Sequence, residues 1–396
     1  MRTAVVGGGA AGFFLAVQLK ERMPLMDVTI LERSHRVLAK VLVSGGGRCN
    51  CTNTFRQVAD LAEVYPRGHR LMRRLFHHFD CHDAYAWFQH HGVPLVVQDD
   101  ECVFPASQDA RSIADCLTAE ARRLGVVIEK GRAVTSLADL DGYDFVAVTT
   151  GGSPRAKGLQ WLADAGHTIE QPVPSLFTFS IADDRLRQLM GTVDAKASVL
   201  LAGTRYRASG PLLVTHWGMS GPAILRLSSY AARWLSEHQY QATLVVNWAD
   251  AHERIVADRL AALAASHPRR QLVHTPPFDL TQRLWHYLVA KSLGERGATL
   301  LWADAGKKDM NRLVGVLTSD SYQMAGRAPY RDEFVTCGGI SLSSVYPQTL
   351  ESRTRPHLYF AGEVLDIDGV TGGFNFQAAW TTAYTVALAI ADACSE

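Results

Sequence analysis

The chain has 396 residues, of which 47% are apolar and 20% are charged, as in soluble globular proteins. Its 40 lysines and arginines almost balance its 39 aspartates and glutamates, so the composition gives no electrostatic reason to expect a nucleic-acid partner, and none is expected. No apolar run reaches the length of a membrane span, and the seven scattered cysteines are typical of reduced thiols. We therefore expect a cytoplasmic protein of two or three domains without a membrane partner.

The first 32 residues predict a dinucleotide-binding βαβ unit. The apolar run Thr3–Val6 enters a glycine turn that fits G-x-G-x-x-G at Gly7, Gly9 and Gly12. A helical pattern follows, and a second strand-like run ends at Glu32. In such a unit Gly7 permits the tight turn, Gly9 lets the backbone approach a pyrophosphate, and Gly12 lets helix and strand pack closely. The helix N-terminus would face the phosphates, and Glu32 would accept hydrogen bonds from ribose hydroxyls.

The remaining elements follow in an order that suggests one domain interrupted by an insertion. After Pro172 the pattern changes to short strands separated by glycine and aspartate turns, and residues 251–325 are mostly helical in pattern. Residues 328–346 return to a strand-and-glycine pattern. Helices are predicted over 67–92, 110–124, 252–265, 280–293 and 378–391, and strands over 93–97, 126–129, 133–137, 145–149, 176–181, 198–201, 206–207, 212–214, 242–247 and 358–360.

Three further segments carry groups suited to binding a cofactor. Ser44–Asn53 places three glycines before arginine and asparagine side chains, which favours a ligand-binding edge over a flexible surface loop. Thr149–Ser153 places glycines at the end of a strand, where open α/β sheets bind ligands, although an ordinary turn has the same pattern. Leu358–Ala379 contains a strand, Glu363 and a glycine turn that opens the last helix. The N-terminus of that helix would stabilise the electron-rich end of a flavin ring.

These motifs resemble the HI0933-like family of NAD(P)/FAD-dependent oxidoreductases, also called BaiN/YhiN-like or aminoacetone-oxidase-like flavoproteins. The segments that carry the resemblance are Ser44–Asn53, Val103–Ser107, Thr215–Ala223 and Gly362–Gln377. The resemblance implies an α/β fold, with a two-part Rossmann-type FAD-binding domain, an inserted β-barrel-like domain and a helical subdomain. The expected boundaries are 1–185 and 328–396 for the FAD-binding domain, 186–250 for the inserted β domain that covers the substrate, and 251–327 for the helical insertion.

By the same resemblance, FAD contacts are expected along both halves of the Rossmann-type domain. Val134 is expected to contact the adenine through its backbone. The contact residues are Gly7, Gly9, Ala11, Gly12, Glu32, Arg33, Lys40, Arg48, Cys49, Asn50, Val134, Gly151, Glu363, Asp366, Asn375, Phe376 and Gln377.

The expected chemistry is hydride transfer between flavin N5 and an unidentified small-molecule substrate by an FAD-dependent oxidoreductase. NAD(P)H is a candidate transient donor, although no second G-x-G-x-x-G follows a strand in the middle of the chain. Reduction of an activated C=C or C=O group stays open beside two alternatives, an amine oxidase that uses O₂ and a non-redox FAD-binding module acting on RNA or protein. The sequence determines neither the substrate nor the oligomeric state.

Few side chains outside the cofactor motifs are candidates for catalysis. His216 is a candidate proton donor, with a structural role as the alternative. Cys49 is expected to pack against the cofactor, because the short C-x-C spacing with Cys51 does not favour a redox pair. The histidine pairs at 77–78 and 90–91 have no carboxylate or cysteine partners at ligand spacing, so no metal site is expected.

Overall fold

The structure, a computed structural model, describes residues 1–153, 156–328 and 335–395. The chain divides into two compact units: unit 1 comprises Met1–Pro174 and Tyr330–Glu396, and unit 2 comprises Ser175–Pro329. Within the described ranges, no helix combines the length and apolar character that crossing a membrane requires.

Unit 1 is built on a five-stranded parallel sheet with the strand order β16-β7-β1-β2-β6. The chain runs from β1 outward to β2 and β6, and then crosses to β7 on the other side of β1. The winding therefore reverses between β1 and β7, and in sheets of this type a ligand binds beyond the carboxyl ends of the strands at that point. The strands are β1 (Arg2–Val6), β2 (Asp27–Glu32), β6 (Val127–Lys130), β7 (Phe145–Val148) and β16 (Leu358–Phe360).

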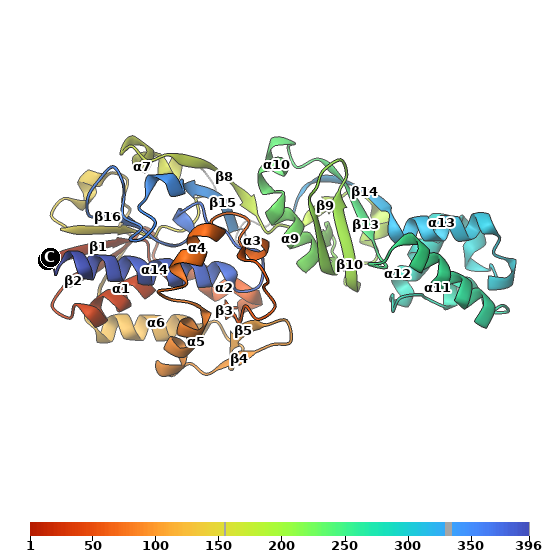
Figure 1. Cartoon of the computed structure of the whole chain (residues 1–396), viewed down its shortest axis with the longest axis horizontal. Coiled ribbons are helices and arrows are strands. Elements are labelled where there is room, and N and C mark those ends of the chain that lie inside the picture. Colours follow the sequence, from red (N-terminus) through yellow and green to blue (C-terminus); the bar gives the residue numbers. More distant parts are fainter. Residues whose placement is uncertain (154–155, 329–334, 396) are drawn as a thin grey trace. The chain divides into compact units, whose positions relative to one another are not determined.

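Two helices from opposite ends of the chain pack together in unit 1, α1 (Ala10–Arg22) and α14 (Phe374–Ala393) (Figure 1). All residues from Ala11 to Leu19 of α1 are buried, so this helix is covered nearly all round. The ring of Phe14 lies 5.3 Å from that of Trp380, centroid to centroid. Small residues along α14 allow the close approach of the two helices.

Shorter elements complete unit 1. A three-stranded sheet has the order β3-β5-β4, and β8 pairs with β15. The elements are α2 (Ala39–Gly47), β3 (Thr52–Asn53), α3 (Leu61–Val64), α4 (His69–Leu75), α5 (Cys81–His90), β4 (Leu95–Val97), β5 (Cys102–Pro105), α6 (Arg111–Arg123), α7 (Gln160–Asp164), β8 (Ile169–Ser175) and β15 (Val335–Ile340).

Unit 2 is a closed antiparallel barrel with the strand order β10-β11-β12-β9-β14-β13, accompanied by helices (Figure 1). Closure pairs every strand on both sides and removes the exposed edges that an open sheet would leave. The elements are β9 (Phe179–Ile181), α8 (Asp184–Arg187), β10 (Val193–Leu201), β11 (Arg207–Val214), β12 (Gly218–Ser220), α9 (Pro222–Tyr230), α10 (Ala232–Glu237), β13 (Ala242–Asn247), α11 (Glu253–Ser266), α12 (Gln282–Leu293), α13 (Lys307–Thr318) and β14 (Asp320–Arg327). The parallel sheet, barrel and helices confirm the expected fold class.

Two local predictions in unit 1 are wrong, both because an aspartate caps a helical turn. The strand predicted over 133–137 is absent, since the Asp139 carboxylate accepts hydrogen bonds from the backbone N–H groups of Thr135 and Ser136 and starts a 3₁₀ turn at Leu137–Leu140. The single helix predicted over 67–92 is divided into α4 and α5. Asp80 begins α5 with a capping box, which ends the preceding segment.

The barrel also extends beyond the segment 186–250, where a β domain is expected. Strand β9 precedes that segment, and β14 lies within the region predicted to be mostly helical. Closure explains the difference, because β9 and β14 pair with each other and β14 also pairs with β13. Arg207 and the strand predicted over 212–214 belong to the single strand β11, which continues through Gly210 and Pro211, whereas Tyr206 precedes it.

Two glycines of the first turn have different roles, since Gly12 allows close packing and Gly9 leaves room for a ligand. A Cβ atom added at Gly12 would lie 2.0 Å from the Gly7 carbonyl oxygen and 2.7 Å from Thr149 Oγ1, whereas one added at Gly9 has no neighbour within 4 Å. We expect Gly12→Ala to lower the free energy of unfolding by about 1–3 kcal/mol, because α1 must move away from the sheet. Chemical denaturation without added flavin measures this loss. Gly9→Ala is the matched control and should unfold like the wild type, and an equal loss in both variants would contradict the assignment.

Candidate functional site

The carboxyl ends of β1, β2 and β7 meet around the first glycine turn. The hydroxyl of Thr149, which follows β7, donates to the Gly7 carbonyl oxygen at 2.9 Å. Glu32, at the end of β2, accepts from the backbone N–H of Gly8 at 2.7 Å and from that of Ser34 at 2.8 Å. These bonds hold the turn while the backbone at Gly9 stays uncovered. The turn therefore fits a pyrophosphate at the N-terminus of α1, and Glu32 lies where a ribose hydroxyl would need an acceptor.

The second glycine segment forms a left-handed turn at the end of α2. Regular helix geometry stops before Ser44, whose ψ is 150°, and φ is 57°, 68° and 84° at Gly45, Gly46 and Gly47. These angles favour glycine because a side chain would be strained there. Arg48 turns back on this loop, with Nε donating to the Gly45 carbonyl oxygen at 3.2 Å and the guanidinium carbon 4.4 Å from the Phe104 ring centroid. A phosphate contact by Arg48 stays a prediction.

The loop after Arg48 is bonded to the start of α14, more than 300 residues away in sequence. A Cβ atom at Gly373 would lie 2.2 Å from the Thr52 carbonyl oxygen, so the two segments are in close backbone contact. The structure thus joins two of the predicted cofactor motifs into one surface. The hydrogen bonds run from Thr52 Oγ1 to Gln377 Oε1 (2.6 Å) and from Asn53 Nδ2 to the Gly372 carbonyl oxygen (3.0 Å). With the Asn50 amide oriented so that its oxygen faces Gly373 N, a third bond forms there at 3.1 Å.

Side chains in the first turn of α14 hold the protein's own backbone and neighbours. Asn375 exchanges two 2.8 Å hydrogen bonds with the backbone of Gly369. The buried Gln377 bonds Thr52 and, at 3.0 Å, Thr381, and the Phe376 ring stacks on Trp380. The helix N-terminus, where glycine stands at the N-cap, is therefore the group this segment offers to an electron-rich ring.

Glu363 connects the third motif to α2. Its carboxylate forms an ion pair with Lys40 Nζ at 2.8 Å. It also accepts hydrogen bonds from the backbone N–H of Thr336, at 2.8 Å, and from that of Gly152. Burial alone would raise the pKa of Glu363, but the Lys40 ammonium and these hydrogen bonds outweigh it and hold the pKa below its ordinary value of 4.5. A Cβ atom at Gly151 would lie 3.8 Å from this carboxylate, so Gly151, Lys40 and Glu363 are gathered in one place.

The two cysteines of the C-x-C segment are buried thiols. Cys49 and Cys51 are both fully buried and free. Burial raises the pKa of Cys49 to about 12 and that of Cys51 well above its ordinary value. The thiolate needed for disulfide exchange is therefore scarce at neutral pH, which favours the packing role over a redox pair.

The remaining predicted contacts lie in different surroundings. Val134 packs against a small core formed by Ala4, Val6, Leu31 and Leu140 instead of lying in a strand. Ala11 is buried in α1 and Arg33 is exposed. The Asp366 backbone N–H donates to Ile340 at 2.9 Å. His216 belongs to unit 2, where it is exposed between β11 and β12, and its catalytic role stays a prediction.

A buried ion pair beside the last motif was missed from the sequence. Asp368 is fully buried and receives Arg67, whose Nε donates at 2.5 Å and whose Nη2 makes a second contact. Nearby, the Tyr65 hydroxyl donates to the Phe374 carbonyl oxygen at 2.8 Å. These contacts fix the loop before α14. The acidic pair Asp366-Ile367-Asp368 was the available signal, but nothing in the sequence identified Arg67 as its partner.

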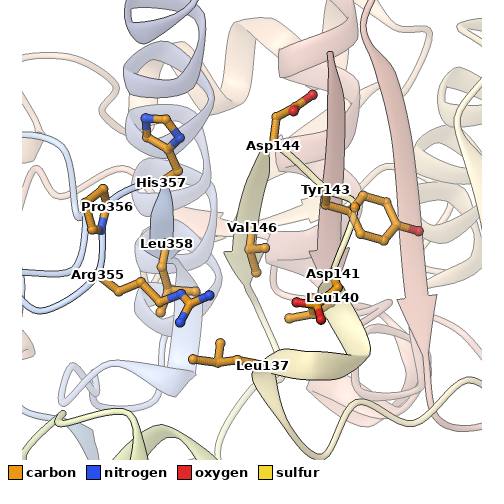
Figure 2. A pocket seen from close by; sticks show the side chains of 11 residues that line it. Leu137, Leu140, Asp141, Tyr143, Asp144, Val146, Arg355, Pro356, His357 and Leu358 are labelled. Carbon is orange, nitrogen blue, oxygen red and sulfur yellow. The ribbon is translucent and has the colours of Figure 1, made fainter.

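A cavity of about 210 Å³ lies beside the amino ends of β7 and β16, at the end of the sheet opposite to the glycine turn. Arg355 and His357 line it from the segment before β16, and Asp141 and Tyr143 line it from the segment before β7 (Figure 2). The glycine turn and Glu32 lie at the carboxyl ends of the strands, so this cavity does not belong to the candidate cofactor site.

Comparison with known proteins places these observations in a family context. The sequence profile described as "HI0933-like protein Rossmann domain" matches residues 1–389. A "3-dehydro-bile acid delta(4,6)-reductase" from Clostridium scindens is 26% identical, with 99% of each chain covered. A "Ribosomal RNA dihydrouridine synthase" from Escherichia coli is 30% identical, with 97% of this chain and 96% of the relative covered. The protein of the same name from Haemophilus influenzae is 27% identical, with 98% and 97% covered.

Among solved structures, a 3-ketosteroid delta1-dehydrogenase from Sterolibacterium denitrificans matches with a TM-score of 0.49 and 12% identity, with 99% of each chain covered. An L-proline dehydrogenase from P. horikoshii matches with a TM-score of 0.38 and 12% identity, over 99% of this chain and 93% of that one. Similarity at this level carries no information on activity.

The Glu363 cluster predicts a stability change at acidic pH. Because the pKa of Glu363 is depressed in the folded protein, its stabilising contribution is present above the ordinary value of 4.5 and is lost as the pH falls through the folded-state pKa. We therefore expect the difference in unfolding free energy between wild type and Glu363→Gln to be constant near neutral pH and to shrink below about pH 4. Denaturant titrations across this range measure it, with Glu129→Gln, which removes an exposed carboxylate, as the control. A difference that stays constant down to pH 3 would show that Lys40 does not stabilise the charged form.

Proposed function

The chain belongs to the HI0933-like Rossmann-domain family, which confirms the resemblance seen in its motifs. On this basis we propose that the protein is an FAD-dependent oxidoreductase. We propose that it reduces a carbon–carbon double bond conjugated to a carbonyl group. The observation that carries the proposal is the glycine turn between β1 and α1, uncovered at Gly9 and flanked by Glu32 at the end of β2. Bound FAD would supply the hydride-transfer chemistry.

Each described group of the site has a definite binding task under this proposal. The backbone at Gly9 and the N-terminus of α1 would bind the pyrophosphate, and Glu32 would accept from a ribose hydroxyl. The N-terminus of α14 would offer its partial positive charge to the electron-rich end of the flavin ring. The Lys40–Glu363 pair links α2 to the Gly151 turn, and both would then line the cofactor site.

The names of the relatives support the reaction class. A delta(4,6)-reductase acting on a 3-dehydro-bile acid and a dihydrouridine synthase both imply hydrogen addition to a C=C bond conjugated to a carbonyl. The substrates in the two names are very different, whereas the bond that changes is of one kind. We therefore propose this reaction for the chain ahead of amine oxidation, with NAD(P)H as the electron donor.

We propose a uracil ring in RNA as the substrate, because the charge of the chain is unevenly distributed. Residues 33–74 contain nine lysines and arginines but two acidic residues, a net charge of +7 within a chain whose total is +1. All of these basic residues except Arg67 are exposed. The expectation that no nucleic acid binds rested on total charge, which conceals this segment. Exposed arginines pair readily with backbone phosphates, and two relatives are named for ribosomal RNA.

A small-molecule enone is the second candidate substrate. The relative from Clostridium scindens, named for a bile-acid derivative, covers this chain as completely as the two RNA-directed relatives do. A small substrate would not need the basic segment, so the two candidates predict different effects of salt and of charge reversal.

The first test concerns the flavin and its donor. We expect the purified wild type to retain FAD, and its visible absorbance to bleach anaerobically when NADH or NADPH is added. Gly9→Ala should fold normally but lose most of its FAD, because the added methyl group would occupy the pyrophosphate approach. Wild-type protein without affinity for FAD would overturn the proposal, and hydrogen peroxide formed from an amine would instead support an oxidase.

The second test concerns RNA. The exposed Arg70 and Arg74 lie one helical turn apart on α4, and Arg70→Glu combined with Arg74→Glu should weaken RNA binding and reduce the slope of log affinity against log salt by about two. Filter binding to unmodified ribosomal RNA transcripts measures affinity, and mass spectrometry measures dihydrouridine. Arg254→Glu with Arg259→Glu on α11 is the control of equal charge change. Reduction of a small enone, with no binding or reduction of RNA, would establish the second candidate instead.

A further inference from the structure

Three helices of unit 1 bring one histidine and two glutamates together on the side of the protein away from the glycine turn. Glu21 lies in the last turn of α1, His91 follows the end of α5 and Glu120 lies near the end of α6. His91 Nε2 is 3.2 Å from a Glu21 carboxylate oxygen and 3.9 Å from one of Glu120. One candidate ligand atom from each of the three side chains lies within 4.8 Å of the other two.

The orientation of His91 leaves its second nitrogen facing both carboxylates. Nδ1 lies 2.7 Å from the Trp87 carbonyl oxygen, and since a carbonyl can only accept, Nδ1 carries the proton. The Trp87 ring also stacks on the imidazole, with the centroids 4.0 Å apart. When Nε2 carries no proton, it presents a lone pair toward Glu21 and Glu120, and the three acceptors then need a cation between them.

Outer contacts hold both carboxylates in place. Gln18 Nε2 donates to Glu21 Oε2 at 3.1 Å, which leaves Oε1 toward His91. Arg123 Nε donates at 2.8 Å to Glu120 Oε2, the same oxygen that lies 3.9 Å from His91 Nε2, and the Arg123 side chain is 59% exposed. An ion bound there would take Glu120 Oε1 or displace the exposed Arg123 side chain. Even with Arg123 counted, two carboxylates and a neutral imidazole give the cluster a net charge of −1. Hydrogen-bonded carboxylates and a histidine that donates its other N–H to a backbone carbonyl are the usual surroundings of a metal site.

We propose that Glu21, His91 and Glu120 bind a divalent transition-metal ion, with Zn²⁺ as the best fit. Tetrahedral zinc with ligand bonds of about 2.1 Å places its ligand atoms about 3.4 Å apart, close to the two separations measured at His91. Imidazole and carboxylate are both zinc ligands, and water would complete the coordination. The ion would link the ends of α1, α5 and α6, so its role is to stabilise the helices that surround the Rossmann sheet. The expectation of no metal site considered neighbours in sequence, whereas these glutamates come from other helices.

Zinc binding by the full-length protein tests the proposal. After dialysis against a chelator, the wild type titrated with zinc chloride in a calorimeter should bind a single ion per chain, and zinc should raise its thermal midpoint. His91→Gln should abolish both effects, and Glu21→Gln should weaken binding at least about tenfold, because each removes a ligand. Glu21 lies at the end of its helix, so its variant keeps the test informative if the His91 variant fails to fold.

Two control variants separate this site from other zinc ligands. His90→Gln removes the exposed histidine beside His91 and should leave binding unchanged. Cys116→Ser removes the thiol that donates to the His91 carbonyl oxygen and should also leave binding unchanged. A wild type that binds no zinc, or a His91→Gln variant that binds it as tightly as the wild type, would overturn the proposal.

Discussion

The candidate site depends on a contact that only glycine permits. Gly12 lies so close to the Gly7 carbonyl oxygen and the Thr149 hydroxyl that hydrogen is the largest group its α-carbon can carry toward them. This contact sets the distance of α1 from the sheet and the place where its N-terminus points. Since α14 packs along α1, it positions the second helix N-terminus as well. Both partial positive charges of the site therefore follow from the same close approach.

The sequence predicted best the features that depend on local pattern. The glycine turn, the acid at the end of β2, the strand at Leu358–Phe360 and the helix ending before Gly125 all carry their signals within a few residues. Parallel strands buried on both faces give continuous apolar runs, which explains why β1 and β7 were recognised. The inserted barrel was expected from the family resemblance, and the strand predicted over 176–181 includes β9, but β12 and β14 were not predicted.

Features that depend on distant partners were not predictable in this way. Asn375 and Gln377 have the polar groups expected of flavin ligands, and the structure shows that they also bond Gly369, Thr52 and Thr381, while their contact with the flavin stays a prediction. Which partner such a polar side chain bonds depends on the groups that the folded chain brings next to it. The same limit applies to His91, whose acidic neighbours come from helices that precede and follow it in the sequence. It also applies to the net charge of the whole chain, which does not reveal a single segment of high positive charge.

The pairing of β13 with β14 has a topological consequence. Val246 lies opposite Asp320, so the whole segment between them, with α11, α12 and α13, occupies the place of the turn in a β-hairpin. The ladder hydrogen bonds of the barrel close without help from this segment. The register of the surrounding strands therefore does not fix the length or helical content of this segment. The segment with α11, α12 and α13 is therefore equivalent to a long hairpin loop, which can add protein surface without changing the strand pairing of the barrel.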